Sequence, residues 1–138
     1  MEKKFPSKIG YLILIPIGLI LAVPFVLVTN DTLSWPTIFV PLIGSAFFLH
    51  IFMTTYYVIK GGNLKIRSGF IYRLDVEIST IRNINESNSI LSSPATSLDR
   101  LEVIFNKYDS VLISPKEKSE FIKTMLEINP TIEVNYKK

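Results

Sequence analysis

IGYLILIPIGLILAVPFVLV, residues 9–28, contains no formally charged side chain over twenty positions. A helix of this length is roughly 30 Å long at about 1.5 Å per residue, which matches the hydrocarbon core of a bilayer. A second apolar run covers residues 37–57 and has one ionisable group, His50. Asp31, in the connector at residues 29–36, is the one formally charged residue in or between the two runs. The sequence therefore predicts a hairpin of two membrane-spanning helices, with the lipid bilayer as a partner.

A cleaved signal peptide is the alternative for the first run, because Lys3, Lys4 and Lys8 precede it. A signal peptide has a shorter apolar region that ends in a small-x-small cleavage site. Here the run continues through residues 21–24 (LAVP) into further apolar residues, and the second run follows closely. We therefore expect the first run to be retained as an anchor.

The distribution of lysine and arginine predicts the orientation, because positively charged loops resist translocation. Residues 1–8 form a basic leader with three lysines, the connector has none, and Lys60, Lys65 and Arg67 follow the second run. We therefore expect a cell-membrane protein with two spans, both termini in the cytoplasm and the connector outside the cell. Amphipathic aromatic residues fall at the predicted boundaries: Tyr11, Trp35 and Tyr56-Tyr57.

Composition limits what the rest of the chain can be. With 138 residues in total, there is room for one small domain beyond the hairpin, at residues 58–138. From Lys60 onward there are twelve Lys and Arg and ten Asp and Glu, so positive and negative charges are nearly balanced. The segment therefore lacks the concentrated basic face of a nucleic-acid-binding protein. The absence of cysteine excludes disulfides, thiolate catalysis and cysteine zinc sites.

Most of the predicted domain has the pattern of short strands. Apolar and polar residues alternate over residues 70–78, the clearest half-buried strand in the chain. Turn signals separate this strand from its neighbours: Gly61-Gly62-Asn63, Ser68-Gly69 and Lys107-Tyr108-Asp109. Short strands joined by hairpins imply an antiparallel sheet that curls or closes to hide its edges.

A helix is predicted after the last of these strands. Ser114 is placed as the N-cap, Pro115 suits the first helical position, and Glu117 completes a capping box. Apolar residues then recur at helical spacing: Phe121, Ile122, Met125, Leu126 and Ile128. The fold class that we expect is therefore a membrane helical hairpin plus an α+β domain.

Three segments of this domain carry a resemblance to a known family: Leu64-x-Ile66-x-Ser68-Gly69, residues 92–103 (SSPATSLDRLEV), and Ile113-Ser114-Pro115-Lys116 followed by Phe121. They resemble the bacterial pleckstrin-homology-like (PH-like) family, over roughly residues 56–130. The resemblance implies a curved antiparallel β-barrel capped by the C-terminal helix. Members of the family often carry one or two N-terminal membrane spans.

Within this family, the small size, the hairpin and the high Ile, Lys and Asn content resemble bacteriocin self-immunity proteins. This resemblance implies a non-enzymatic protein that protects its producer by binding or shielding at the membrane, with a bacteriocin or its membrane target as partner. The alternative is a membrane-tethered scaffold or regulatory module that docks a membrane protein complex or anionic lipid. The sequence predicts no oligomeric state.

The sequence offers few groups for catalysis. Ser-His-Asp chemistry needs a histidine beside a serine and a carboxylate, but His50 is the one histidine and lies in a predicted span. A metal would have to be held by carboxylates alone. We therefore expect no catalytic residue, no cofactor and no metal. An ionisable group in a bilayer is often functional, but for His50 we favour packing against the other helix.

The first candidate binding surface is Lys60, Lys65 and Arg67. This spacing resembles the basic hairpin with which some eukaryotic pleckstrin-homology domains bind phosphoinositides, and anionic lipids attract such residues. The alternative is that these charges only follow the positive-inside pattern beside a membrane helix.

The second candidate surface is Ser97, Asp99 and Arg100, at the end of a Ser- and Asn-rich loop over residues 85–97. Functional contacts concentrate on loops that a rigid scaffold holds in place. The alternative is a solvated connection whose side chains satisfy local backbone groups. We expect Asp99 and Arg100 to form a pair that fixes the fold near this loop.

Overall fold

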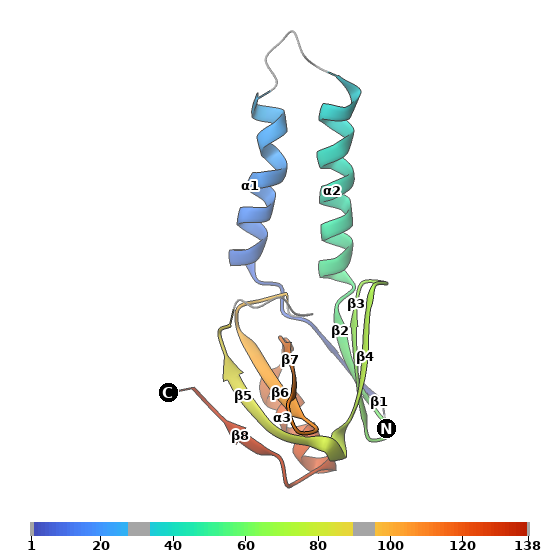
Figure 1. Cartoon of the computed structure of the whole chain (residues 1–138), viewed down its shortest axis with the longest axis vertical. Helices are drawn as coiled ribbons and strands as arrows, with labels where there is room; N and C mark the ends of the chain where they lie inside the picture. Colours follow the sequence, from blue (N-terminus) through green and yellow to red (C-terminus); the bar gives the residue numbers. More distant parts are fainter. Residues whose placement is uncertain (1, 28–33, 90–95, 138) are drawn as a thin grey trace.

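The computed structural model describes residues 2–27, 34–89 and 96–137 (Figure 1). Most of the predicted connector, and residues 92–95 of the family-like segment, lie outside the described residues. The elements in chain order are β1 (Glu2–Pro6), α1 (Tyr11–Leu27), α2 (Trp35–Met53), β2 (Tyr56–Lys60), β3 (Asn63–Ser68), β4 (Tyr72–Glu77), the 3-10 turn η1 (Ile78–Thr80), β5 (Ile81–Ser87), β6 (Arg100–Phe105), β7 (Asp109–Ile113), α3 (Lys118–Ile128) and β8 (Glu133–Asn135). The expected α+β class is confirmed.

Two four-stranded sheets form the domain, with strand orders β1-β2-β3-β4 and β7-β6-β5-β8. All neighbouring strands are antiparallel except β5 and β8, which are parallel. The expectation of a purely antiparallel sheet is therefore wrong at this edge. The reason is the connection through α3, which returns the chain so that β8 enters alongside β5 in the same direction.

The N-terminal residues differ most from the expectation. Residues 1–8 are predicted as a basic leader, but Glu2–Pro6 form β1, which pairs with β2 over its whole length. Phe5 is 4% exposed, and its ring meets the ring of Phe121 edge-on with centroids 5.3 Å apart. The domain therefore contains residues from before α1 and from after α2 in the sequence. The two helices are inserted between two neighbouring strands of one sheet, β1 and β2 (Figure 1).

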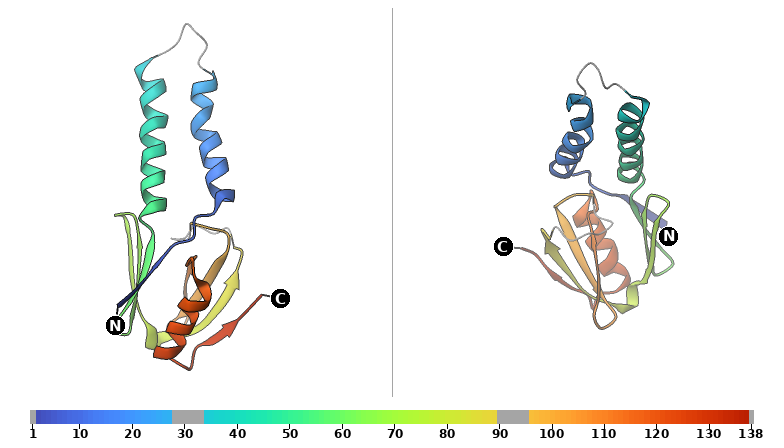
Figure 2. Two further views of the ribbon diagram at one scale, coloured as in Figure 1. Left: turned by 180° about the vertical axis from the view of Figure 1, so that it is seen from behind. Right: turned by 45° about the horizontal axis from the view of Figure 1, so that its top comes forward.

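Helices α1 and α2 stand side by side at one end of the sheets (Figures 1 and 2). In the described chain, α2 is the one helix long and apolar enough to cross a membrane, and 11% of its apolar stretch is buried in the protein. Helix α1 has 17 described residues and contains the apolar segment Leu14–Val23.

The second helix ends earlier than predicted, at Met53 instead of residue 57. The hydroxyls of Thr54 and Thr55 donate to the carbonyls of His50 and Ile51, and the β-branched and aromatic residues that follow form β2. Tyr56-Tyr57, predicted at the membrane boundary, therefore lie in a strand, and the side chain of Tyr57 is fully buried.

The hydrophobic core lies between the two sheets and α3 (Figure 2). Helix α3 begins at Lys118, with Glu117 as N-cap and no side-chain cap bond, so the predicted start at Ser114 is wrong. Residues 114–116 instead contact the N-terminal segment, through an isolated bridge between Ser7 and Pro115. The core comprises Phe5, Tyr57, Ile59, Leu64, Ile66, Val76, Ile78, Ile81, Ile84, Leu101, Val103, Val111, Ile113, Phe121, Ile122, Met125 and Ile132.

Candidate functional site

Residues 7–10, which lead from β1 into α1, are hydrogen-bonded to the segments that precede β2 and β6. The amide of Ser7 donates to the carbonyl of Thr55 at 3.1 Å, and the amide of Gly10 donates to the carbonyl of Thr96 at 2.8 Å. A Cβ on Gly10 would lie 2.8 Å from the Cα of Ser97, so only glycine permits this close approach. The start of α1 is therefore fixed to the domain.

A cluster of four buried hydroxyls lies beneath this segment: Ser7, Tyr57, Thr96 and Ser114, which we call the hydroxyl cluster. The Oγ of Ser7 is at its centre, 3.0 Å from the Oη of Tyr57, 2.8 Å from the Oγ1 of Thr96 and 3.0 Å from the Oγ of Ser114. The amide of Ser114 donates to the Tyr57 Oη at 3.0 Å. Burial raises the pKa of the Tyr57 hydroxyl above its usual value, despite hydrogen bonds from Ser114 and Ser7. Tyr57 is therefore a neutral hydrogen-bonding partner.

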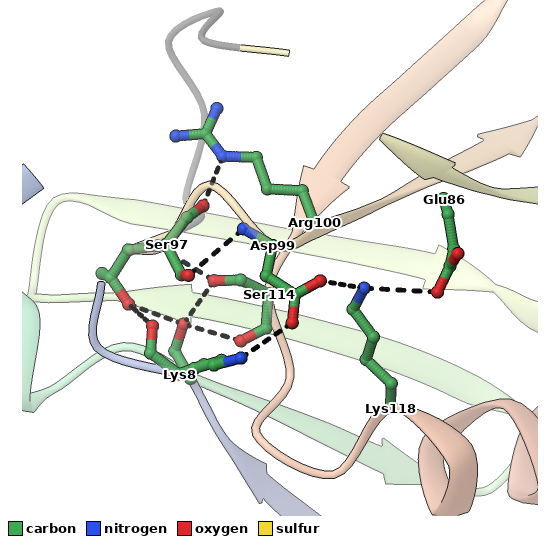
Figure 3. A network of polar contacts seen from close by, with 9 residues as sticks. Lys8, Glu86, Ser97, Asp99, Arg100, Ser114 and Lys118 are labelled. Atoms are coloured by element: carbon green, nitrogen blue, oxygen red, sulfur yellow. Dashed lines mark hydrogen bonds and ion pairs between the residues drawn. The ribbon is translucent and has the colours of Figure 1, made fainter. Parts of the chain in front are cut away.

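A line of ion pairs continues from the hydroxyl cluster to α3 (Figure 3). The Nζ of Lys8 lies 2.8 Å from one oxygen of Asp99, and Lys118 forms an ion pair with the other oxygen. Lys118 also lies 3.5 Å from the Oε1 of Glu86. Partial burial raises the pKa of Asp99, but the hydrogen bonds from Lys118 and Lys8 outweigh burial, so its pKa lies below the usual value. These pairs connect the N-terminal segment, β5, the residue before β6 and α3.

Arg100 is 5% exposed and contacts backbone carbonyls. Its Nε donates to the carbonyl of Ser97 at 2.6 Å and its Nη1 to the carbonyl of Ser89 at 2.7 Å. Burial lowers the pKa of the guanidinium. Asp99 and Arg100, expected to form a pair, have different partners: Asp99 binds lysines, whereas Arg100 donates to the loop backbone. Both fix the fold, through separate partners.

Lys60, Lys65 and Arg67 lie away from this network, on the outward face of the first sheet. Lys60 forms an ion pair with Glu2 at 2.8 Å. The hydrogen bond and charge of Glu2 raise the pKa of Lys60. Lys65 and Arg67 are half-buried on β3, where Lys65 is in register with Asp75 of β4. The two groups of predicted binding residues therefore form separate surfaces.

A pocket opens where the helices meet the domain. Lys8 and Lys116 line it together with apolar side chains at the helix ends, including Tyr11, Phe52 and Met53. A lining of lysines and apolar groups suits an amphipathic anion. Among the described residues, no group of three His, Cys, Asp or Glu side chains could hold a metal ion.

Asp99→Asn is expected to make protein stability less dependent on pH in the acidic range, which is the acid limb of a plot of stability against pH. The pKa of Asp99 in the folded protein lies below its value in the unfolded chain, which is about 3.9. Its ion pairs therefore stabilise the fold fully above the unfolded pKa, and this stabilisation is lost as the pH falls through the folded pKa. The loss at neutral pH should be about 0.5–1 kcal/mol, since the side chain is 44% exposed. The measurement is thermal unfolding against pH, with Asp109→Asn as the control, because its carboxylate accepts from Asn106 and not from a lysine. Identical acid limbs in both variants would contradict the expectation.

Comparison with known proteins matches the chain to a family. A family model described as a bacterial PH domain matches residues 55–129, more than half of the 138 residues. The matched segment begins after α2 and contains β2 to β7 and α3, so that β1 lies outside it. No curated protein and no solved structure matches the chain.

Proposed function

The chain belongs to the bacterial PH domain family, and on that premise we propose that it is a non-enzymatic binding protein whose PH-like domain is held at the cytoplasmic face of the cell membrane by the hairpin α1–α2. The observation that carries the proposal is the insertion of both helices between β1 and β2. An anchor inserted within a sheet fixes the position of the domain, whereas a terminal tether would leave it free to rotate.

The apolar surface of α2 supports the membrane placement. Val40, Leu42 and Ile43 are each more than half exposed, and large apolar side chains surround the helix. A helix that is apolar all round is stable when it is buried in protein or in lipid, and little of α2 is buried in protein. The 17 described residues of α1 are about 25 Å long, at the lower limit for a span.

Strand pairing supports an even number of spans. Because β1 pairs with β2 residue for residue, the start of α1 and the end of α2 lie on the same side of any membrane that they cross. The lysines near both ends favour the cytoplasmic side. We also propose that the bridge from Ser7 to Pro115 closes the two sheets into a barrel at the end nearest the helices.

Bacteriocin self-immunity is the specific role that we propose for this anchored domain, with the bacteriocin or its membrane target as partner. Support comes from the sequence resemblance to self-immunity proteins. The second candidate is a scaffold or regulatory module that docks a membrane protein complex or anionic lipid. The pocket lined by Lys8 and Lys116 at the foot of the helices favours this second candidate.

Expression in a bacteriocin-sensitive strain tests the immunity role. For a bacteriocin whose gene is found next to the gene of this chain, the full chain should lower sensitivity. A variant with residues 11–53 replaced by a flexible linker should not, because it lacks the anchor. Unchanged sensitivity despite good membrane expression would remove the immunity role. Lysis by an unrelated membrane-active peptide is the specificity control, and should be the same in both strains.

A further inference from the structure

The turn between β3 and β4 presents two large apolar side chains to the outside. Phe70 is 62% exposed and Ile71 is 66% exposed. Gly69 precedes them with φ +59°, a left-handed conformation that tightens the turn. Turns on water-facing surfaces favour Gly, Asn, Asp, Ser and Pro. Adjacent exposed Phe and Ile at a turn therefore indicate that the turn contacts an apolar environment.

This turn lies against the foot of α2. The ring of Phe70 is 5.7 Å from the ring of His50 and 6.2 Å from the ring of Phe47. A Cβ on Gly69 would lie 3.3 Å from the Cγ1 of Ile51. Figure 1 shows the β3–β4 end of the first sheet beside the last turns of α2. Since Phe47 lies about 9 Å along the helix from Met53, an α2 that spans a bilayer carries this turn into its interface.

Two arginines flank the turn on the outward face of the sheet. Arg67 of β3 and Arg73 of β4 are register partners, so their side chains leave the same face at adjacent positions. Like charges opposite each other destabilise a strand pair, and in the described part of the chain neither arginine has an ion pair with an acidic residue. This pair of cations therefore lacks a counter-charge from the described protein.

On β3 and β4, the charges of this outward face change sign along the strands. Arg67 and Arg73 lie near the helices, Lys65 and Asp75 are partners in the middle, and Glu77 lies at the far end. An anionic membrane surface attracts the basic end and repels the acidic end, and the attraction is short-ranged. The gradient therefore favours one orientation of the sheet, with the β3–β4 turn toward the bilayer.

We infer that the β3–β4 turn is a second membrane contact, in which Phe70 and Ile71 insert at the boundary of headgroups and acyl chains and Arg67 and Arg73 bind anionic lipid phosphates. The inference rests on the proposed function, because the hairpin must first place α2 in the bilayer. An anionic lipid surface matches both the apolar turn and the arginines behind it. His50 then lies at the interface as a packing partner of Phe70. The contact sets the tilt of the domain relative to the membrane.

The test places a tryptophan at the turn in the full chain, reconstituted in vesicles of phosphatidylcholine with phosphatidylglycerol. Trp35, the one native tryptophan, is first replaced by phenylalanine. Phe70→Trp should then be quenched by lipids brominated near the headgroup severalfold more than Tyr108→Trp in the same background. Tyr108 is the matched control, because it is 85% exposed and belongs to the β6–β7 turn, at the end of the domain away from the helices (Figure 1).

The outcomes separate the inference from the proposed function. Equal quenching at the two positions, in protein that floats with the vesicles, would overturn the contact and leave the anchor intact. Protein that does not float with the vesicles would overturn both. Arg67→Gln with Arg73→Gln, in the Phe70→Trp chain, should reduce quenching in the anionic vesicles to the level of pure phosphatidylcholine. Unchanged quenching would overturn the role of the arginines.

Discussion

A fragment that begins at Thr54 is expected not to fold cooperatively, although it contains every residue matched by the family model. It lacks β1, so the edge of β2 is left unpaired. It also lacks Phe5, whose burial against Phe121 contributes to the core. Truncation of a buried phenylalanine costs about 3–5 kcal/mol, which is a large share of the roughly 5–15 kcal/mol of a typical domain.

The matched control keeps residues 1–10 and replaces residues 11–53 by a glycine- and serine-rich linker. This variant should unfold in one thermal transition followed by circular dichroism, because it restores β1 and the hydrogen bonds of Ser7 and Gly10. In the same variant, Phe5→Ala should lower the melting temperature strongly. If the fragment from Thr54 melts at the same temperature as the linker variant, β1 does not stabilise the domain.

Ser7→Ala is expected to lower the free energy of unfolding of the linker variant by about 1–3 kcal/mol. The substitution removes the hydroxyl at the centre of the hydroxyl cluster and leaves buried groups of Tyr57, Thr96 and Ser114 with one partner fewer. Urea denaturation measures the change. Ser110→Ala, on an exposed position of β7, is the control and should change stability by less than about 0.5 kcal/mol.

A double-mutant cycle with Tyr57→Phe sharpens this prediction. Because the two hydroxyls bond to each other, the losses from Ser7→Ala and Tyr57→Phe should add to more than the loss in the double variant. Strict additivity, or a Ser7→Ala variant as stable as Ser110→Ala, would show that the hydroxyl cluster does not hold the N-terminal segment to the domain.

Patterns among residues close together in the sequence predicted both helices of the hairpin and strand β4. The two apolar runs gave α1 and α2, and the alternation in residues 70–78 gave β4, with Leu74 and Val76 facing inward. The same alternation placed Phe70 in the strand, but Gly69 and Phe70 form the turn that precedes β4. Periodicity shows which residues lie on the same face of a strand, but it does not show where the chain turns.

Non-local contacts explain what the sequence could not predict. Strand β1 is short, its one buried apolar residue is Phe5, and its partner β2 lies beyond both helices. No local pattern distinguishes such a strand from a basic leader. Ser114 has the sequence of an N-cap, but its hydroxyl binds Ser7 and its carbonyl accepts the amide of Lys8, so α3 starts later.

The candidate site combines residues that are neighbours in sequence with partners from distant segments. Ser97, Asp99 and Arg100 are adjacent in sequence and stand together in the structure. Their partners Lys8 and Lys118 come from distant segments, and a lone lysine carries no signal of its ion pair. Gly10, the second residue of the first apolar run, was a local sign that another segment approaches closely there.

The central claim is that α1 and α2 span the membrane and hold the domain in the cytoplasm. It is tested most directly by finding the side of the membrane on which each end of the molecule lies. The chain has no cysteine, so Ser34→Cys at the start of α2 and Tyr108→Cys in the β6–β7 turn each introduce a single thiol. A maleimide that cannot cross membranes, added to whole cells, should label Ser34→Cys and leave Tyr108→Cys unlabelled until the cells are permeabilised. Labelling of Tyr108→Cys in intact cells would contradict a cytoplasmic domain anchored by a two-span hairpin.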